Sequence, residues 1–445
     1  VMDILSSIMK QVESFNDELA RKFKLKYNPF PKSGIAIIND SDKVIEKLEP
    51  VDDIVKNKIY EFIQDALSAN FNPTLKDDKY ISLVVRGEYG SGKTQTLMYI
   101  KYLLKSIKSE KIKPYVVYID NPGEKLSQLI GEIVSQIGVE NFKKYLWDIF
   151  IKYLDDNPDI KITLTTVSAT DLGLFANQEE ASEEVSLSYS NYKQLIDKLT
   201  LGRTSSEIKA VMGKMKDHLI KSYLSITDSP TVASTFCDIV SETVGVSKSW
   251  DLLTSGSVKE LDKREVDVLR AIVRIVCDQM GYTDFIILID EFEEITAERL
   301  EKSEVDNYLR NLRLLIDREK NWCSVFAMTG KALNMVEEYS KPLADRIMGR
   351  VIDLKPLDVN TLSHVILNYL SLARTEKIED ELYPFAPSGI EHIYDIKGKN
   401  VLYKGSPRFA LKMCYLLLQR AATELEEGEH IDGGFVDKHL DEILK

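Results

Sequence analysis

Residues Ile81–Thr94 read ISLVVRGEYGSGKT, and this stretch decides the fold. Its first part, Ile81–Arg86, is short and apolar, as a buried strand is. Its second part, Gly87–Thr94, matches the pattern G-x-x-x-x-G-K-[ST] at every position. Helical spacing of apolar residues predicts a helix from Lys93 to about Ser109. A strand that passes through a glycine-rich turn into a helix is the context expected of a phosphate-binding P-loop.

The residues of this P-loop have separate expected roles around a nucleoside triphosphate. Backbone N–H groups of the loop would surround the phosphates, and the following helix would direct its positive end at them. Lys93 is expected to reach the β- and γ-phosphates, and the Thr94 hydroxyl is expected to be a ligand of Mg²⁺. The predicted nucleotide-binding residues are Gly87, Glu88, Tyr89, Gly90, Ser91, Gly92, Lys93, Thr94 and Gln95.

A second apolar run, FIILI, ends in the acidic pair Asp290-Glu291. Asp290 follows Thr94 by 196 residues (290 − 94), and the two side chains are expected to share the Mg²⁺ site. Glu291 is expected to orient an attacking water or to accept its proton. The alternative is that the acidic residues only cap the next helix. Glu293 and Glu294 are interpreted as the solvated start of that helix and not as ligands.

Four polar residues further along the chain are candidates for contact with the γ-phosphate. Thr329 follows the predicted strand Ser324–Met328 and either contacts the phosphate or the lytic water, or caps the next helix. Arg346 and Arg350 precede the last predicted strand, where an arginine can enter a neighbouring subunit's site. Arg346 is the favoured one, and a surface arginine is the alternative for both. Arg408 opens a C-terminal helix, where the dipole disfavours a cation, so a functional reason for it is expected.

Strands alternate with helices on both sides of the P-loop, which predicts an α/β fold with a parallel sheet. We expect a P-loop NTPase αβα sandwich that carries a helical insertion and an α-helical C-terminal lid. The predicted divisions are 1–70 for N-terminal helices and a linker, 71–357 for the ATPase core with the insertion at about 140–258, and 358–445 for the lid. Within the insertion, residues 168–191 are rich in Ser, Glu and Asn and are expected to form a mobile loop.

The N-terminal segment has its own pattern. Apolar residues at helical spacing in Met2–Lys24 predict an amphipathic helix that packs on the body or on a neighbour. Two prolines in Tyr27–Pro31 predict a rigid extended linker. Val44–Ala69 is predicted to be helical again.

The composition excludes several classes of protein. The formal net charge is −13, so bulk charge does not favour nucleic acid, and any DNA contact needs a local basic patch or a ring of subunits. No signal peptide and no apolar run of membrane-spanning length is present, which predicts a cytoplasmic protein without a membrane partner. The cysteines form no CxxC pair, which argues against a disulfide framework or zinc site; they are Cys237, Cys277, Cys323 and Cys414.

The order of these motifs resembles that of the AAA+ ATPases. It comprises the P-loop, the acidic pair, Thr329, Arg346 and the motif GSPR at Gly405–Arg408. The resemblance implies an αβα core, a helical lid, and hydrolysis of ATP with Mg²⁺ between adjacent subunits of a homo-oligomer. It also implies that Arg346 acts in trans and that Arg408 senses the nucleotide from the lid.

Two sets of residues carry finer resemblances. The runs PLADR (342–346) and VIDLKPL (351–357) resemble the initiator and helicase-loader branch related to the origin recognition complex. The runs DEFE (290–293) and NLRLLID (311–317) are similar to ATPases of BREX-type phage-defence systems. The 37 residues after Arg408 (445 − 408) complete a lid, so the winged-helix DNA-binding domain of initiators is not expected.

The predicted function is therefore an AAA+ ATPase that hydrolyses ATP to remodel or load a protein–nucleic acid assembly, of the helicase-loader or phage-defence type. The insertion at 140–258 is expected to bind a protein partner. The alternative is a nucleotide-gated signalling switch, similar to STAND ATPases, with slow ATP turnover.

Overall fold

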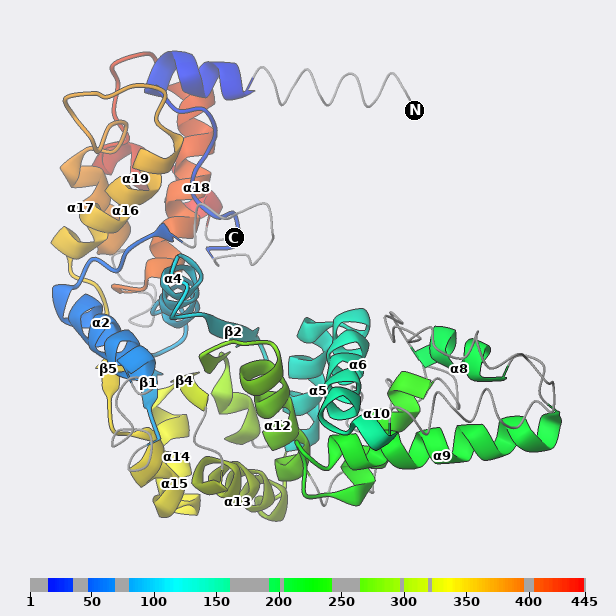
Figure 1. Ribbon diagram of the computed structural model, residues 1–445. Coiled ribbons are helices and arrows are strands. Elements are labelled where there is room, and N and C mark those ends of the chain that lie inside the picture. The colour runs from blue at the N-terminus through cyan, green and yellow to red at the C-terminus, as the bar shows by residue number, and fades with distance from the viewer. Residues whose placement is uncertain are drawn as a thin grey trace.

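The computed structural model shows a core built on a sheet, an arm of helices and a lid (Figure 1). The predicted mobile loop at 168–191 and the first part of the predicted N-terminal helix lie outside the described residues. The described residues are 15–34, 47–68, 80–160, 192–200, 204–241, 265–296, 300–318, 322–395 and 404–443.

Within the described residues, one sheet of five parallel strands forms the centre of the core. Its order is β2-β3-β4-β1-β5, so β4 separates β1 from β3, and the carboxyl ends of all three meet at one edge. The predicted α/β P-loop NTPase fold with a parallel sheet is confirmed. The strands are β1 (Ser82–Arg86), β2 (Pro114–Ile119), β3 (Asp284–Ile289), β4 (Trp322–Met328) and β5 (Val351–Asp353).

Helices cover both faces of this sheet because successive residues of each strand point to opposite sides. In β3, Ile286 and Leu288 pack in a core with α2 (Asp53–Ser68) and α4 (Lys93–Lys105), whereas Phe285 and Ile287 pack in a second core on the other face. The second core is covered by four helices and by a short fifth one, so the arrangement is the expected αβα sandwich. These helices are α5 (Leu126–Ile137), α12 (Glu265–Arg274), α13 (Lys302–Arg318), α14 (Gly330–Tyr339) and α15 (Lys341–Ile347).

Two predicted helix boundaries are wrong. The helix after the P-loop, α4 (Lys93–Lys105), ends before Ser109, where the chain becomes highly polar. The helix predicted over Val44–Ala69 begins only at Asp53, as α2 (Asp53–Ser68), since Pro50 cannot lie inside a helix. Helix α12 continues as the π-helix η2 (Ile275–Gln279).

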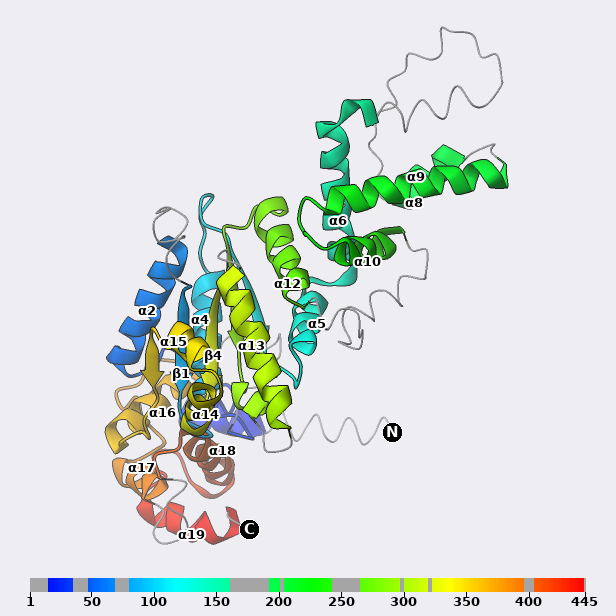
Figure 2. The same ribbon diagram turned by 90° about the horizontal axis from the view of Figure 1, so that it is seen from below.

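The predicted helical insertion forms an arm that projects from the core beyond α5 (Figures 1 and 2). Aromatic side chains pack within the arm. The ring of Phe236 lies edge-on to those of Phe142 and Tyr223, at centroid distances of 5.5 and 6.2 Å. None of the helices that the described part of the chain forms is long and apolar enough to cross a membrane. The arm helices are α6 (Val139–Asp156), α8 (Tyr192–Thr200), α9 (Ser205–Tyr223) and α10 (Pro230–Ser241).

The N-terminal segment packs against the lid. A helix at 15–23 places Leu19 and Phe23 in the same apolar core as the lid helices. Lys22 lies across this contact, where its Nζ donates to the Ala422 carbonyl at 2.9 Å. The N-terminal helix therefore packs on the lid and not on the parallel sheet. The lid helices are α16 (Val359–Ala373), α17 (Pro387–Tyr394), α18 (Pro407–Glu424) and α19 (Gly433–Ile443).

Phe30 is expected to anchor the N-terminal segment to the lid. It is 3% exposed, and its ring lies 5.8 Å from that of Tyr369 and 5.7 Å from that of Phe385. Phe30→Ala should destabilise the lid by about 3–5 kcal/mol, because it leaves a cavity among packed rings. Hydrogen exchange should show faster exchange in α16 and α18 and unchanged protection in β3. The exposed Tyr27, changed to Ala, is the control; equal effects of the two variants would contradict this account.

Candidate nucleotide-binding site

The P-loop connects the carboxyl end of β1 to the start of α4. Gly90 and Gly92 have positive φ values of 77° and 100°, which glycine adopts without steric cost. These two residues turn the loop so that Lys93 becomes the first residue of α4. The Gly87 N–H donates to the Met328 carbonyl at 3.2 Å, which fixes the start of the loop against β4.

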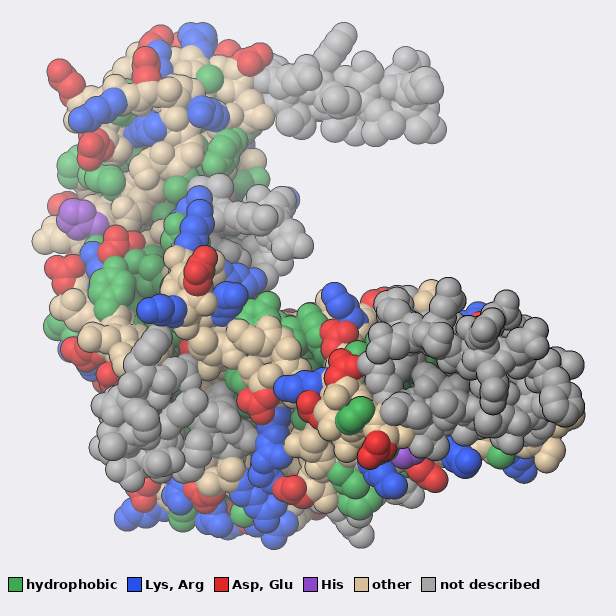
Figure 3. Space-filling view, viewed as in Figure 1, with side chains coloured by type: hydrophobic (Ala, Val, Ile, Leu, Met, Phe, Trp, Pro, Cys, Tyr) green, Lys and Arg blue, Asp and Glu red, His purple; other side chains and the backbone are tan. Residues whose placement is uncertain are grey.

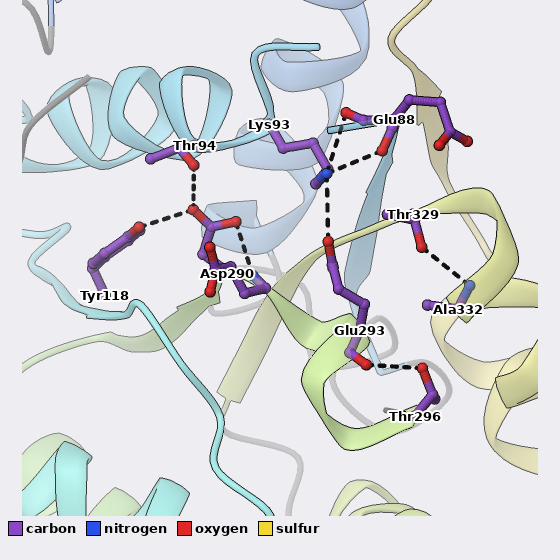
Figure 4. Close-up of polar contacts among 11 residues, drawn as sticks. Glu88, Lys93, Thr94, Tyr118, Asp290, Glu293, Thr296, Thr329 and Ala332 are labelled. Atoms are coloured by element: carbon purple, nitrogen blue, oxygen red, sulfur yellow. Dashed lines mark hydrogen bonds and ion pairs between the residues drawn. The ribbon is translucent and has the colours of Figure 1, made fainter. Parts of the chain in front are cut away.

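Lys93 is almost completely buried within this loop. Its exposed fraction is 8%, and its Nζ donates to the carbonyls of Gly87 and Glu88 at 3.0 and 3.4 Å. It also forms an ion pair with Glu293, with 3.5 Å between Nζ and Oε1 (Figure 4). The ring of Tyr89 lies on another side, 5.2 Å from Nζ to the ring centroid.

The interpretation of Glu293 as a solvated residue is wrong. It is 8% exposed and lies in the 3₁₀-helix η3 (Phe292–Thr296). Its carboxylate faces Lys93, with 3.5 Å between Oε1 and Nζ. Burial raises the pKa of the Glu293 carboxyl, and the Lys93 ammonium opposes that rise. No local sequence signal distinguishes this buried turn from a solvated helix start, since the same residues are compatible with both.

Asp290 is buried at the end of β3 and accepts several hydrogen bonds. Its Oδ2 accepts from the Thr94 hydroxyl at 2.6 Å and from the Tyr118 hydroxyl at 2.9 Å, while Oδ1 accepts from the Glu291 N–H at 2.9 Å (Figure 4). Tyr118 was not singled out in the sequence. It lies next to Leu288 in the register of β2 with β3, which places it beside the strand end. Burial, and then the nearby Asp290 charge, raise the pKa of the Tyr118 phenol.

Glu291 differs from Asp290 in exposure and backbone conformation. Its side chain is exposed, and its φ of 47° lies in the left-handed region that a non-glycine residue rarely adopts. Such strain tends to occur at functional sites. Partial burial, followed by the charges of Asp290 and Glu293, raises the pKa of the Glu291 carboxyl. The pair therefore consists of one buried carboxylate that is hydrogen-bonded and one that is open to solvent.

Thr329 caps the helix that follows β4. Its Oγ1 accepts from the Ala332 N–H at 3.2 Å, and the residue is 7% exposed (Figure 4). Of the two interpretations of Thr329, the structure thus shows the helix cap. Contact with a phosphate stays a prediction.

Each of the two arginines before β5 forms an ion pair with a carboxylate of the same chain. The exposed Arg346 forms an ion pair with Asp317 of α13, and its Nη1 donates to the Pro342 carbonyl at 2.7 Å. Arg350 forms an ion pair with Asp65 of α2. Neither of them lines the pocket that contains the P-loop.

This pocket extends from the P-loop to the lid. Its lining includes the polar side chains of Lys93, Asp290 and Glu291 together with several apolar side chains. Arg408 also lines it, and its backbone N–H donates to the Gly90 carbonyl at 3.3 Å, so lid and P-loop are in direct contact. The apolar lining residues are Leu48, Pro50, Val51, Leu354, Leu357, Val365, Tyr369 and Leu411.

No protein-family model matches the chain, and no curated protein matches its sequence. Similar solved structures include two of the ORC2 protein of Aeropyrum pernix, as ADPNP–ADP complexes and in the ADP form, both 12% identical. Their TM-scores are 0.46 and 0.48, and the matches cover 89% and 90% of this chain and 68% and 72% of theirs. Cdc6p of Pyrobaculum aerophilum is also 12% identical, with a TM-score of 0.41, covering 90% of this chain and 71% of that one.

The contact between P-loop and lid gives a stability prediction. Alanine at either Gly90 or Gly92 must adopt a positive φ, at a cost of about 1–2 kcal/mol. At Gly90 the added Cβ would also lie 2.9 Å from the Arg408 Cβ, whereas at Gly92 it would meet nothing within 4 Å. Gly90→Ala should therefore lower the melting temperature more than Gly92→Ala. Thermal unfolding without nucleotide measures this, and a larger loss for Gly92→Ala would contradict the packing described.

Proposed function

We propose that the chain is an AAA+ ATPase that binds ATP with Mg²⁺ between core and lid and hydrolyses it. The observation that carries this proposal is the contact of Thr94 with Asp290, 2.6 Å apart although 196 residues separate them in the sequence. The fold brings the end of the P-loop and the end of the acidic strand to one point. Lys93 and Glu291 line the same pocket as Thr94 and Asp290.

The residues present fit Mg²⁺. The Thr94 hydroxyl and the Asp290 carboxylate are adjacent oxygens, which are the ligand type that Mg²⁺ prefers. The described residues contain no group of three or more His, Cys, Asp or Glu side chains able to hold a metal ion. One or two protein ligands suffice for Mg²⁺, because phosphates and water complete its shell. Bound Mg²⁺ would neutralise charge on the β- and γ-phosphates.

The charged residues that line the pocket then have distinct tasks. The buried Lys93 ammonium contacts the β- and γ-phosphates, at the positive end of α4. Glu291 orients the attacking water and accepts its proton, since it is the exposed carboxylate and its raised pKa makes it a better base. Arg408 reaches the γ-phosphate from the lid. The apolar lining residues of the pocket contact the adenine ring of the nucleotide.

The assembly in which this ATPase acts is proposed from the sequence motifs. Homo-oligomerisation would bring the exposed Arg346 to a neighbour's site, and the arm would bind a protein partner. For DNA, Figure 3 shows Lys and Arg side chains along the lower edge of the viewed face, over α13 and α15. Exposed Arg310 and Lys341 lie on this part of the chain. Such a patch suits a helicase-loader or phage-defence ATPase.

The second candidate function is the nucleotide-gated signalling switch. The direct contact of the Arg408 backbone with the P-loop favours it, since a lid held on the site can report on the nucleotide. Arg346 would then need no partner site, because Asp317 already pairs with it.

Glu291→Gln should abolish ATP hydrolysis and leave nucleotide binding intact, because it removes a proton acceptor without changing shape. The measurement is steady-state phosphate release with and without duplex DNA. Glu294→Gln, which changes a neighbouring carboxylate by the same chemistry, is the control. Faster phosphate release in the presence of DNA supports the DNA-linked ATPase. Slow phosphate release at the same rate with and without DNA supports the signalling switch. Turnover of Glu291→Gln at the wild-type rate would exclude the assigned role.

Arg346→Ala should lower turnover of the assembled protein by about 10³-fold or more, as removal of a trans-acting arginine does. Asp317→Ala breaks the same intramolecular ion pair but keeps the arginine. We expect Asp317→Ala to retain activity and Arg346→Ala to keep its affinity for ATP. If both variants lose the same activity, the role of Arg346 is confined to the ion pair with Asp317.

A further inference from the structure

Glu293 has an unusual environment for a carboxylate. It is 8% exposed, and neither carboxylate oxygen has a hydrogen-bond partner among the described residues. The charged group within ion-pair distance in this part of the structure is Lys93, at 3.5 Å from Nζ to Oε1. A buried carboxylate without hydrogen bonds is unfavourable, so its charge depends on this lysine for stabilisation.

The other acidic residues of the site are differently placed. Asp290 accepts hydrogen bonds from Thr94 and Tyr118, and Glu291 is exposed. Neither forms an ion pair with Lys93 in the structure as described. Glu293 thus differs from both of its acidic neighbours in facing the ammonium directly.

Packing holds Glu293 in this position. The ring of the preceding Phe292 lies 4.9 Å from that of Phe326 and 6.5 Å from that of Tyr308. At the end of η3, the Thr296 hydroxyl donates to the Glu293 carbonyl at 2.9 Å. These contacts fix the backbone of η3 beside the P-loop, and the Glu293 side chain lines the same pocket as Lys93.

We propose that Glu293 competes with the nucleotide's phosphates for the Lys93 ammonium and so sets the affinity of the site for ATP and ADP. This inference rests on the proposed function, in which Lys93 contacts the β- and γ-phosphates. A phosphate gains less from an ammonium whose charge is already balanced, and it is repelled by the carboxylate that remains. Glu293 is thus an affinity-determining residue that acts through Lys93.

The test is Glu293→Gln, which keeps the size of the side chain and removes its charge. Equilibrium titrations with fluorescent mant-ATP and mant-ADP, in Mg²⁺, should show binding tightened by roughly tenfold, the scale of one partly buried charge interaction. The gain should be larger for ATP, because Lys93 contacts its γ-phosphate as well. Glu294→Gln, the same change one residue away, should bind like the wild type.

Unchanged or weaker binding by Glu293→Gln, with normal binding by the wild type, would overturn the inference and leave the proposed function standing. Absence of binding by both proteins would overturn both. Thermal unfolding without nucleotide distinguishes a role in affinity from a role in stability. If Glu293→Gln has a lower melting temperature than the wild type and an unchanged Kd, the ion pair serves fold stability alone. Tighter binding by Glu294→Gln to the same extent would remove the specific role of Glu293.

Discussion

The parallel pairing of β1 and β3 with β4 is the constraint on which the site depends. The register aligns Arg86 with Met328 and Ile289 with Phe326, so β1 and β3 end at the same edge of the sheet. The P-loop and the acidic pair follow directly from these ends. Asp290 follows Thr94 by 196 positions, and the stretch between them includes the whole helical arm, yet the two side chains are 2.6 Å apart.

The lid completes the pocket through a small set of backbone contacts. Gly90 of the P-loop accepts from the Arg408 N–H, and the Leu357 N–H donates to the Gly405 carbonyl at 2.9 Å. The N-terminal segment packs on the lid, where Phe30 stacks on Tyr369, a residue that lines the pocket. Contiguous contacts therefore join the P-loop, the lid and the N-terminal segment.

Local sequence patterns predicted the sheet, the P-loop and the acidic strand, because each is specified by consecutive residues. The position of Glu293 was not predictable in this way. The same amino-acid sequence is compatible with a solvated helix start and with a buried 3₁₀ turn. Only the packing of Phe292 against Phe326 decides between them. Tyr118 was missed because its contact with Asp290 depends on strand pairing, which local pattern does not give.

The central claim is that a nucleoside triphosphate binds between the P-loop and the lid, and site-directed photolabelling tests it most directly. 8-Azido-ATP should crosslink to peptides that carry apolar lining residues of the pocket, around Leu48–Val51 or in α16, and excess ATP should prevent the labelling. Labelling spread over other surfaces, or labelling that ATP does not prevent, would contradict the account.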